Sequence, residues 1–363
     1  MNYLKRMKRS TRESYITYAL VIVLYLVMRA LMGGGHLKSS LQGQLIPICA
    51  YIVMAISLNL TVGVLGELSL GHAGFVSIGA FAGAIACMSL EAAIPSAGVR
   101  LVVAMVIGAV CAGAAGVLIG IPVLRLRGDY LAIVTLAFGE IIKTIINVLY
   151  VGRDVNGLHF GFLSGIGALN LGEGATTIVN GAVGIVGIRK ISTFTSGFVL
   201  ILVTLFIVQN LVSSRSGRAI MALRDNRIAA ESVGIPITKY KLMAFVTSAA
   251  LAGAAGVLYA MSFTAIGADK FGFNMSILIL VFVVLGGLGK LWGSVIATAT
   301  LIILPELLRE FQDYRMLVYA IVLILVMIAT NNAQVRYFFT RIKNAMFKRA
   351  PKNENATDGG TVK

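Results

Sequence analysis

Long apolar runs dominate this sequence and constrain its fold more than any other feature. A helix of about 20 apolar residues crosses the hydrocarbon core of a bilayer, and it satisfies its own backbone hydrogen bonds there. Ten runs follow one another along the chain: Tyr15–Met32, Gln44–Leu65, Phe75–Leu90, Leu101–Leu124, Tyr130–Val151, Gly197–Val212, Leu242–Met261, Met275–Gly289, Leu291–Leu308 and Met316–Thr330. We therefore predict an all-α fold, a polytopic integral membrane helical bundle of about ten transmembrane helices. Because the third and eighth runs are short, a count of eight or nine also fits the pattern.

The composition agrees with a membrane protein. Hydrophobic residues make up 58% of the chain and charged residues 13%, against about 45–50% and 25% in ordinary soluble domains. The 40 glycines suit the close packing of membrane helices. The net charge of +16 could attract nucleic acid, but the basic residues gather at the termini and in one loop, as orientation signals do in membrane proteins. We expect membrane lipid as a partner and no nucleic acid.

The distribution of Lys and Arg predicts the orientation. With the N-terminus in the cytoplasm, the segments on the cytoplasmic side hold more than twice as many basic residues as the segments outside. This bias predicts that both termini are cytoplasmic, which requires an even number of spans. We divide the chain into a basic cytoplasmic N-terminus (1–14), a transmembrane domain (15–332) and a basic, largely disordered cytoplasmic tail (333–363).

Two connections between the runs are long. Gly152–Ser196 is rich in glycine and lies outside, where we expect a short helix or a re-entrant piece. Residues 213–241 lie inside and place Ile220, Leu223 and Ile228 at helical spacing before a Gly-Ile-Pro stop. This pattern predicts one or two short helices against the membrane surface. A short amphipathic helix exposed to the cytoplasm suits the docking of a soluble partner.

The stretch between the second and third runs places a carboxylate, a hydroxyl and an imidazole among glycines. Ionisable groups at membrane depth are costly and usually mark a pathway or a pairing, and glycines let a broken helix expose its backbone to a cavity. The alternative is a cytoplasmic turn with tightly packed helix starts, and the residues themselves leave both interpretations open. The candidates for a translocation path here are Glu67, Ser69, Gly71 and His72.

Glu140 and Lys143 form a second candidate in the fifth run. At spacing i, i+3 they share one helix face and can form an ion pair. A structural pair that neutralises two charges within the membrane is the simpler interpretation. The functional alternative is a polar patch that lines a translocation path.

The sequence shows no motif that is typical of an enzyme active site. Gly286–Gly293 contains a Gly-Lys pair, but Val284 replaces the first glycine of a phosphate loop and Leu291 replaces its Ser or Thr. The three histidines and the three cysteines show no catalytic or metal-ligand spacing. We therefore expect no catalytic residue, no metal and no directly bound cofactor.

Four ordered stretches together resemble one family, the permease subunits of ABC importers for branched-chain amino acids, of the LivM type. The resemblance runs from about Leu45 to Met327, and its order makes it more specific than any one stretch. The stretches are Gly66–Phe75, Leu126–Glu140, Gly217–Asn226 with Ala229–Ile235, and Leu285–Gly293.

The resemblance implies partners and a mechanism. It implies a second permease subunit of the LivH type, two cytoplasmic ATPase subunits that use the ATP, and a periplasmic substrate-binding protein, all at a bacterial inner membrane. The segment from Arg218 to Pro236 looks like the coupling element that docks on the ATPase and drives alternating access. Its candidate coupling residues are Arg218, Arg224, Asp225, Asn226, Ala229, Ala230, Glu231 and Gly234.

The residues leave three alternatives open. A related ABC permease could carry urea, short amides or another small solute. A secondary transporter could use an ion gradient, with Glu140, Lys143 and His72 as relay groups. A passive channel is a third class. Neither of the last two needs the cytoplasmic loop of residues 213–241.

Overall fold

The computed structural model describes residues 9–34, 39–126, 128–154, 157–162 and 176–308, with isolated positions between 314 and 324. The chain divides into two compact units, Met1–Glu306 and Leu307–Lys363. The helices and strands named below lie in the first unit, except that the last helix ends at Leu307. The predicted tail (333–363) and most of the last predicted span lie outside the described residues.

The helices follow the apolar runs of the sequence. Their bounds are α2 Arg9–Gly33, α3 Ser39–Asn59, the π-helix η1 Leu60–Leu65, α4 His72–Ser89, α5 Ala97–Val123, α6 Asp129–Asn147, α7 Phe194–Ser213, α8 Arg215–Asp225, α9 Arg227–Ser232, α10 Ile237–Ala260, α11 Phe273–Gly286 and α12 Leu291–Leu307. Within the described residues, six helices are long and apolar enough to cross a membrane: α2, α3 with η1, α4, α5, α7 and α10. The structure therefore supports a multi-pass helical bundle, while the predicted count of about ten spans stays a prediction. Helices α11 and α12 are apolar but shorter.

Three helices, α4, α5 and α10, form the centre of the bundle. Their backbones approach closely because glycines face one another. A side chain at Gly253 of α10 would overlap the backbone of Gly108 in α5, and one at Gly79 of α4 would overlap the backbone of Gly253. The sequence Ala-Gly-Ala-Ala-Gly-Val-Leu occurs in both α5 and α10, on the two sides of this interface. Small side chains thus bring these membrane helices together.

A five-stranded antiparallel sheet lies beside the helices. The strands are β1 Leu149–Asp154, β2 Gly157–Phe162, β3 Thr176–Asn180, β4 Ile185–Val186 and β5 Ala265–Ile266, in the order β2-β1-β3-β4-β5. Strand β1 pairs with β2 in the register Val151↔Phe160, and its pairing with β3 shifts after Val151. Between β3 and β4 a single 3-10 turn spans Gly181–Val183.

The sheet corrects two predictions. The fold is mostly helical but not all-α, and the described part of residues 152–196 forms mainly strands, with one 3-10 turn, where we expected a short helix or a re-entrant piece. Short strands carry little periodicity of their own. Their backbone groups are satisfied by partners distant in the chain, as where β4 pairs with β5.

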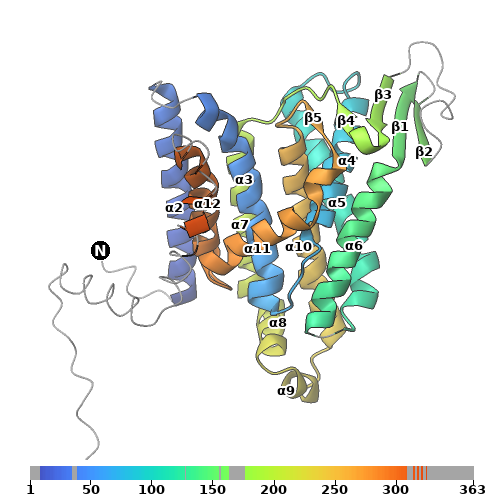
Figure 1. Ribbon diagram of the computed structural model, residues 1–363. Coiled ribbons are helices and arrows are strands. Elements are labelled where there is room, and N and C mark those ends of the chain that lie inside the picture. The colour runs from blue at the N-terminus through green and yellow to red at the C-terminus, as the bar shows by residue number, and fades with distance from the viewer. Residues whose placement is uncertain are drawn as a thin grey trace, which may run out of the picture. The chain divides into compact units, whose positions relative to one another are not determined.

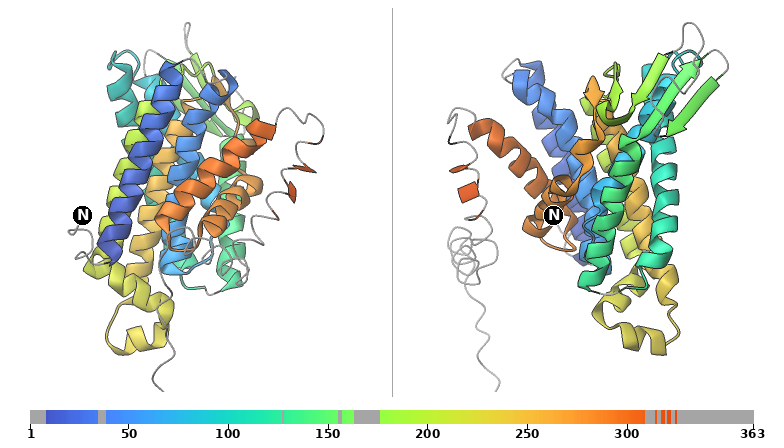
Figure 2. Two further views of the ribbon diagram at one scale, coloured as in Figure 1. Left: turned by 90° about the vertical axis from the view of Figure 1, so that its left-hand side faces the viewer. Right: turned by 45° about the vertical axis from the view of Figure 1, so that its right-hand side comes forward.

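The sheet and the two short helices lie at opposite ends of the bundle (Figure 1, Figure 2). Helix α6 leads directly into β1, and α10 begins after α9 and ends close before β5. The turn between η1 and α4 lies at the α8 end, because α8 packs against η1. The two ends of the bundle therefore carry different elements, and the glycine-rich turn belongs to the end with α8 and α9.

Candidate functional site

The glycine-rich turn follows the π-helix η1, into which α3 widens. Single π-helical turns are rare and often occur at functional sites. The π-helix ends at its C-cap Gly66, whose φ of 81° lies in the left-handed region that favours glycine. The N–H groups of Gly66 and Glu67 both donate to the carbonyl of Thr61. The helix is thus broken at the end of the bundle that carries α8.

Asn59, at the start of this break, is fully buried and connects it to the reversal between α11 and α12. Its Oδ1 accepts a hydrogen bond from Gly289 N at 2.8 Å, and its Nδ2 donates to Ser294 Oγ at 2.8 Å and to Lys290 O at 3.3 Å. Asn59 was not among the residues predicted from the sequence, although a polar amide within a long apolar run is a signal of interhelical hydrogen bonding.

Arg224 of α8 contacts the same break from the other side. Its guanidinium donates to Gly63 O at 3.0 Å and to Asp225 Oδ1 at 3.0 and 3.1 Å. Its aliphatic stem covers Gly66, where a side chain would overlap it. Arg224 therefore connects α8 to the broken helix and does not simply face solvent.

Glu67 forms an ion pair with Lys241, the fifth residue of α10. The side chain of Lys241 is only 5% exposed and that of Glu67 15%. The sequence indicated only an orientation charge for Lys241, at the end of the cytoplasmic loop, but α10 begins at Ile237 and Lys241 lies buried within it. A buried pair of this kind is costly to break, because removing one partner leaves the other charge buried alone.

Ser69, Gly71 and His72 lie where α4 begins and contact several other helices. Gly71 packs against the backbone of Thr135 in α6, whose Oγ1 accepts from Leu70 N at 3.1 Å. The hydroxyl of Ser69 is buried and has no hydrogen-bond partner among the described residues.

The imidazole of His72 is buried beside α3. Its Nε2 lies 2.9 Å from Ser57 Oγ. Ser57 O in turn accepts a hydrogen bond from Ser248 Oγ of α10 at 2.6 Å. His72 therefore sits within a polar contact between three helices, and neither serine was predicted from the sequence.

The predicted ion pair between Glu140 and Lys143 is present, with 3.2 Å between Glu140 Oε2 and Lys143 Nζ. Glu140 Oε1 also accepts from Phe273 N, the first residue of α11, at 3.1 Å. A carboxylate at a helix N-terminus satisfies a free N–H and interacts favourably with the helix dipole. This geometry favours the structural interpretation. Among the described residues, no hydrogen bond or ion pair joins this pair to Glu67 or His72.

Residues 213–241 form two short helices, as predicted. Ser214 caps α8 by accepting from Gly217 N, and Asn226 caps α9 by accepting from Ala229 N. The φ of 82° at Gly234 ends this region before Pro236.

The faces of α8 and α9 differ in exposure. Ile220 and Leu223 of α8 are buried against the bundle, while Ile228 of α9 is 81% exposed and Val233, just after it, 75%. The three apolar residues at helical spacing therefore do not share one buried face. Of the predicted coupling residues, Ala230 is buried, and the exposed ones are Arg218, Arg224, Asp225, Asn226, Ala229, Glu231 and Gly234.

Among the described residues, side chains that can bind a metal do not cluster, and the cysteines are free thiols. In the part of the chain that the structure describes, no three His, Cys, Asp or Glu side chains lie together to hold a metal ion. Cys49 and Cys87 are buried free thiols and Cys111 is partly buried.

The apolar helices define a multi-pass membrane protein, and the pair α8–α9 lies at one end of its bundle (Figure 1). Residues 41–327 match the model of the family described as branched-chain amino acid transport system / permease component. The chain therefore belongs to this family, which confirms the resemblance seen in the sequence.

Two curated relatives carry the name high-affinity branched-chain amino acid transport system permease protein LivM. The protein from Salmonella typhimurium is 35% identical over 293 residues, and that from Escherichia coli is 36% identical over 290 residues. Each alignment covers 77% of this chain and 66% of the relative. The chain thus spans just under two thirds of the length of these relatives. No solved structure shows a significant match.

Proposed function

We propose that this protein is a membrane-spanning permease subunit of an ATP-driven importer that carries branched-chain amino acids across the bacterial inner membrane. The observation that carries the proposal is the pair α8–α9, which projects from the bundle and is joined to the broken helix through Arg224 (Figure 1). Membership of the permease family supports the substrate class, as do the names of the two relatives.

The partners follow from the same proposal. Two ATPase subunits bind and hydrolyse ATP, so the permease itself is not an enzyme. One of them docks on the exposed apolar residues Ile228 and Val233. A second permease subunit completes the pathway, and a periplasmic binding protein delivers the amino acid at the end that carries the sheet. This assignment places α8 and α9 in the cytoplasm, both termini on the same side, and about ten spans between them.

The contacts of the break provide a route for coupling. A displacement of α8 acts on Gly63 O through the guanidinium of Arg224. The amide of Asn59 passes it to the turn between α11 and α12. Packed elements of this kind switch between discrete arrangements, because tightly packed interfaces do not deform continuously. We propose that this switch alternates the side to which the pathway opens.

The test is uptake into proteoliposomes that contain this chain with the two ATPases and the second permease. With the binding protein outside, uptake of radiolabelled leucine should require ATP inside the vesicles and should be inhibited by isoleucine and valine but not by urea. Robust leucine uptake without ATP, driven by a proton or sodium gradient, would instead support the secondary transporter. Uptake of urea in preference to leucine would overturn the substrate class.

The orientation is tested separately on intact cells. A cysteine placed at the exposed position Glu231 of α9 should react with a membrane-impermeant thiol reagent only after the membrane is opened. A cysteine at Val186 of β4, which is 54% exposed at the other end of the bundle, should react at once. The reverse pattern would refute the proposed orientation.

A further inference from the structure

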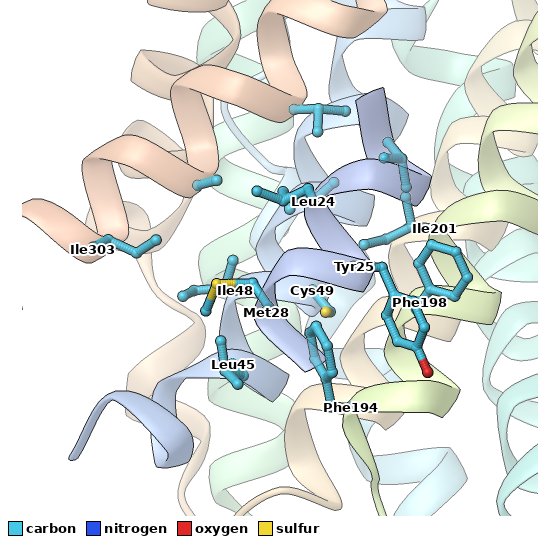
Figure 3. Close-up of a pocket in the computed structure, with 14 residues that line it drawn as sticks. Leu24, Tyr25, Met28, Leu45, Ile48, Cys49, Phe194, Phe198, Ile201 and Ile303 are labelled. Carbon is cyan, nitrogen blue, oxygen red and sulfur yellow. The ribbon is translucent and has the colours of Figure 1, made fainter. Parts of the chain in front are cut away.

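A pocket between α2, α3, α7 and α12 takes no part in the contacts of the break. The pocket has a cavity volume of about 50 Å³, within about 510 Å³ of free space that includes its open mouth. Figure 3 shows Tyr25 with Phe194 and Phe198 on one side of the pocket and Ile303 on the other. The fourteen lining residues are Val21, Leu24, Tyr25, Met28, Leu45, Ile48, Cys49, Ile52, Phe194, Phe198, Ile201, Val295, Ala299 and Ile303.

The lining is suited to a hydrocarbon chain. It contains no charged side chain, and its oxygen-bearing side chain is Tyr25. The ring of Tyr25 stacks on Phe198 with 4.0 Å between the ring centroids and on Phe194 with 5.2 Å. Three of its four helices are long and apolar enough to cross a membrane. An apolar cavity open to the bilayer is filled by apolar groups rather than by water.

A cation lies at the rim of this pocket. Arg29 follows Tyr25 by one turn on the same face of α2, and both side chains reach Thr195 Oγ1 at 3.3 Å. Arg29 and Thr195 are exposed, and no carboxylate pairs with Arg29 among the described residues. An arginine near the end of a membrane helix extends to the membrane interface, and lipid phosphates are the anions available at that depth.

From the pocket and its rim we infer a binding site for an anionic phospholipid, with one acyl chain in the pocket and the phosphate at Arg29. The free amino acid substrate does not fit this site, because the lining offers no carboxylate for its ammonium group. A lipid such as phosphatidylglycerol needs no such partner. The inference does not depend on the proposed function, since it rests on the pocket and Arg29 alone.

The site lies at the end of the bundle opposite α8 and α9, because α2 ends and α7 begins there (Figure 2). In the proposed orientation this is the outer leaflet. Helix α2 contacts the rest of the bundle mainly through α7, so a bound acyl chain fills the space between α2 and its neighbours α3 and α12. The lipid thereby holds α2 in place.

The experiment counts lipids on the assembled transporter by native mass spectrometry in a mild detergent. Phosphatidylglycerol and phosphatidylcholine with identical chains are added in parallel. The unmodified complex should retain phosphatidylglycerol in preference. R29Q should reduce this retention about fivefold, the effect of one basic charge at an anionic surface, and R29K should restore it.

The matched control is R189Q, which removes the same charge from an arginine that pairs with Glu91 outside the pocket. It should leave retention unchanged. A299F, which fills the pocket, should abolish retention of both lipids. Equal retention by R29Q and the unmodified complex would overturn the assignment of the phosphate to Arg29.

A photoreactive phosphatidylglycerol with a diazirine on its acyl chain tests the unmodified protein without any variant. Cross-links should map to peptides that contain Met28, Cys49 or Ile303. Cross-links confined to other surfaces would refute the site, as would displacement of the lipid by leucine. A pocket filled by residues 307–363 or by the second permease would give protein–protein cross-links there when a photoreactive amino acid replaces Leu24, and that result would also refute it.

Discussion

Replacing Arg224 by glutamine tests the proposed coupling route most directly. The change removes the hydrogen bond from the guanidinium to Gly63 O at 3.0 Å, while glutamine keeps the Cβ, Cγ and Cδ atoms that cover Gly66. The N–H groups that follow η1 donate to Thr61, so they do not replace Arg224 at Gly63. The ion pair with Asp225 is also lost, but exposed pairs contribute little.

The magnitude follows from the lost contact. Gly63 is buried, and leaving a buried carbonyl without its charged donor costs about 1–3 kcal/mol. If this contact differs between the two conformations, the coupling between ATPase and pathway falls by the same free energy, which corresponds to roughly 5- to 150-fold. We expect the ratio of leucine transported to ATP hydrolysed to decrease by a factor within this range.

The assay measures both rates in the same proteoliposomes. R224Q should keep the ATPase rate of the assembled complex and lose uptake. The matched control is R215Q, which removes the same charge from the exposed arginine that begins α8 and is not one of the candidate coupling residues. R215Q should retain a transport-to-hydrolysis ratio within about twofold, since surface substitutions away from such contacts are usually small.

Two results would refute the reasoning. If R224Q keeps its transport-to-hydrolysis ratio, the contact with Gly63 carries no coupling. If R215Q and R224Q lose uptake equally, the effect is one of charge on the docking surface and not of the break. If R224Q no longer assembles with its partners in size-exclusion chromatography, Arg224 contributes to the docking of the ATPase instead.

Three further predictions concern stability and packing. K241M should lower the free energy of unfolding in detergent by about 3–5 kcal/mol, because it leaves Glu67 largely buried and unpaired. The double variant E67Q/K241M should recover most of the lost stability. Equal thermal stability of K241M and the unmodified protein would contradict the buried pair. N59L should leave membrane insertion intact but lower uptake by roughly tenfold or more, because about 1–3 kcal/mol of buried hydrogen bonding is lost, and normal uptake by N59L would exclude Asn59 from the route. G253V should reduce the yield of folded protein, because the added side chain overlaps the backbone of α5. G98V should not reduce the yield, because open space surrounds Gly98. Similar yields of the two variants would contradict the glycine contact.

The features that depend on residues close together in the sequence could be predicted. The apolar runs predicted the helices, the Gly-Ile-Pro stop predicted the end of the α8–α9 region, and the spacing of Glu140 and Lys143 predicted their ion pair. The four ordered stretches predicted the family. Each of these depends on neighbouring residues or on a pattern along one helix.

Contacts between distant segments could not be predicted in this way. Glu67 pairs with a residue 174 positions away, and Asn59 bonds to residues about 230 positions away. The strands of the sheet are too short to show a period, and the capping of α11 by Glu140 joins helices 133 positions apart. The hydrogen bonds of Asn59 and Gly63 with other elements are of this kind, so the sequence indicated a break at Gly66 without showing what holds it.

The pairing of β4 with β5 has a mechanical consequence. These strands flank the segment α7–α8–α9–α10, and the hydrogen bonds Ile188 N to Thr264 O and Ser192 Oγ to Leu258 O extend their closure toward the helices. The segment is thus a long hairpin that the sheet closes at one end, while α8 and α9 form its other end. A force on α8 and α9 therefore reaches α4 and α5 through α10, whose Gly253 lies against the backbones of Gly79 and Gly108.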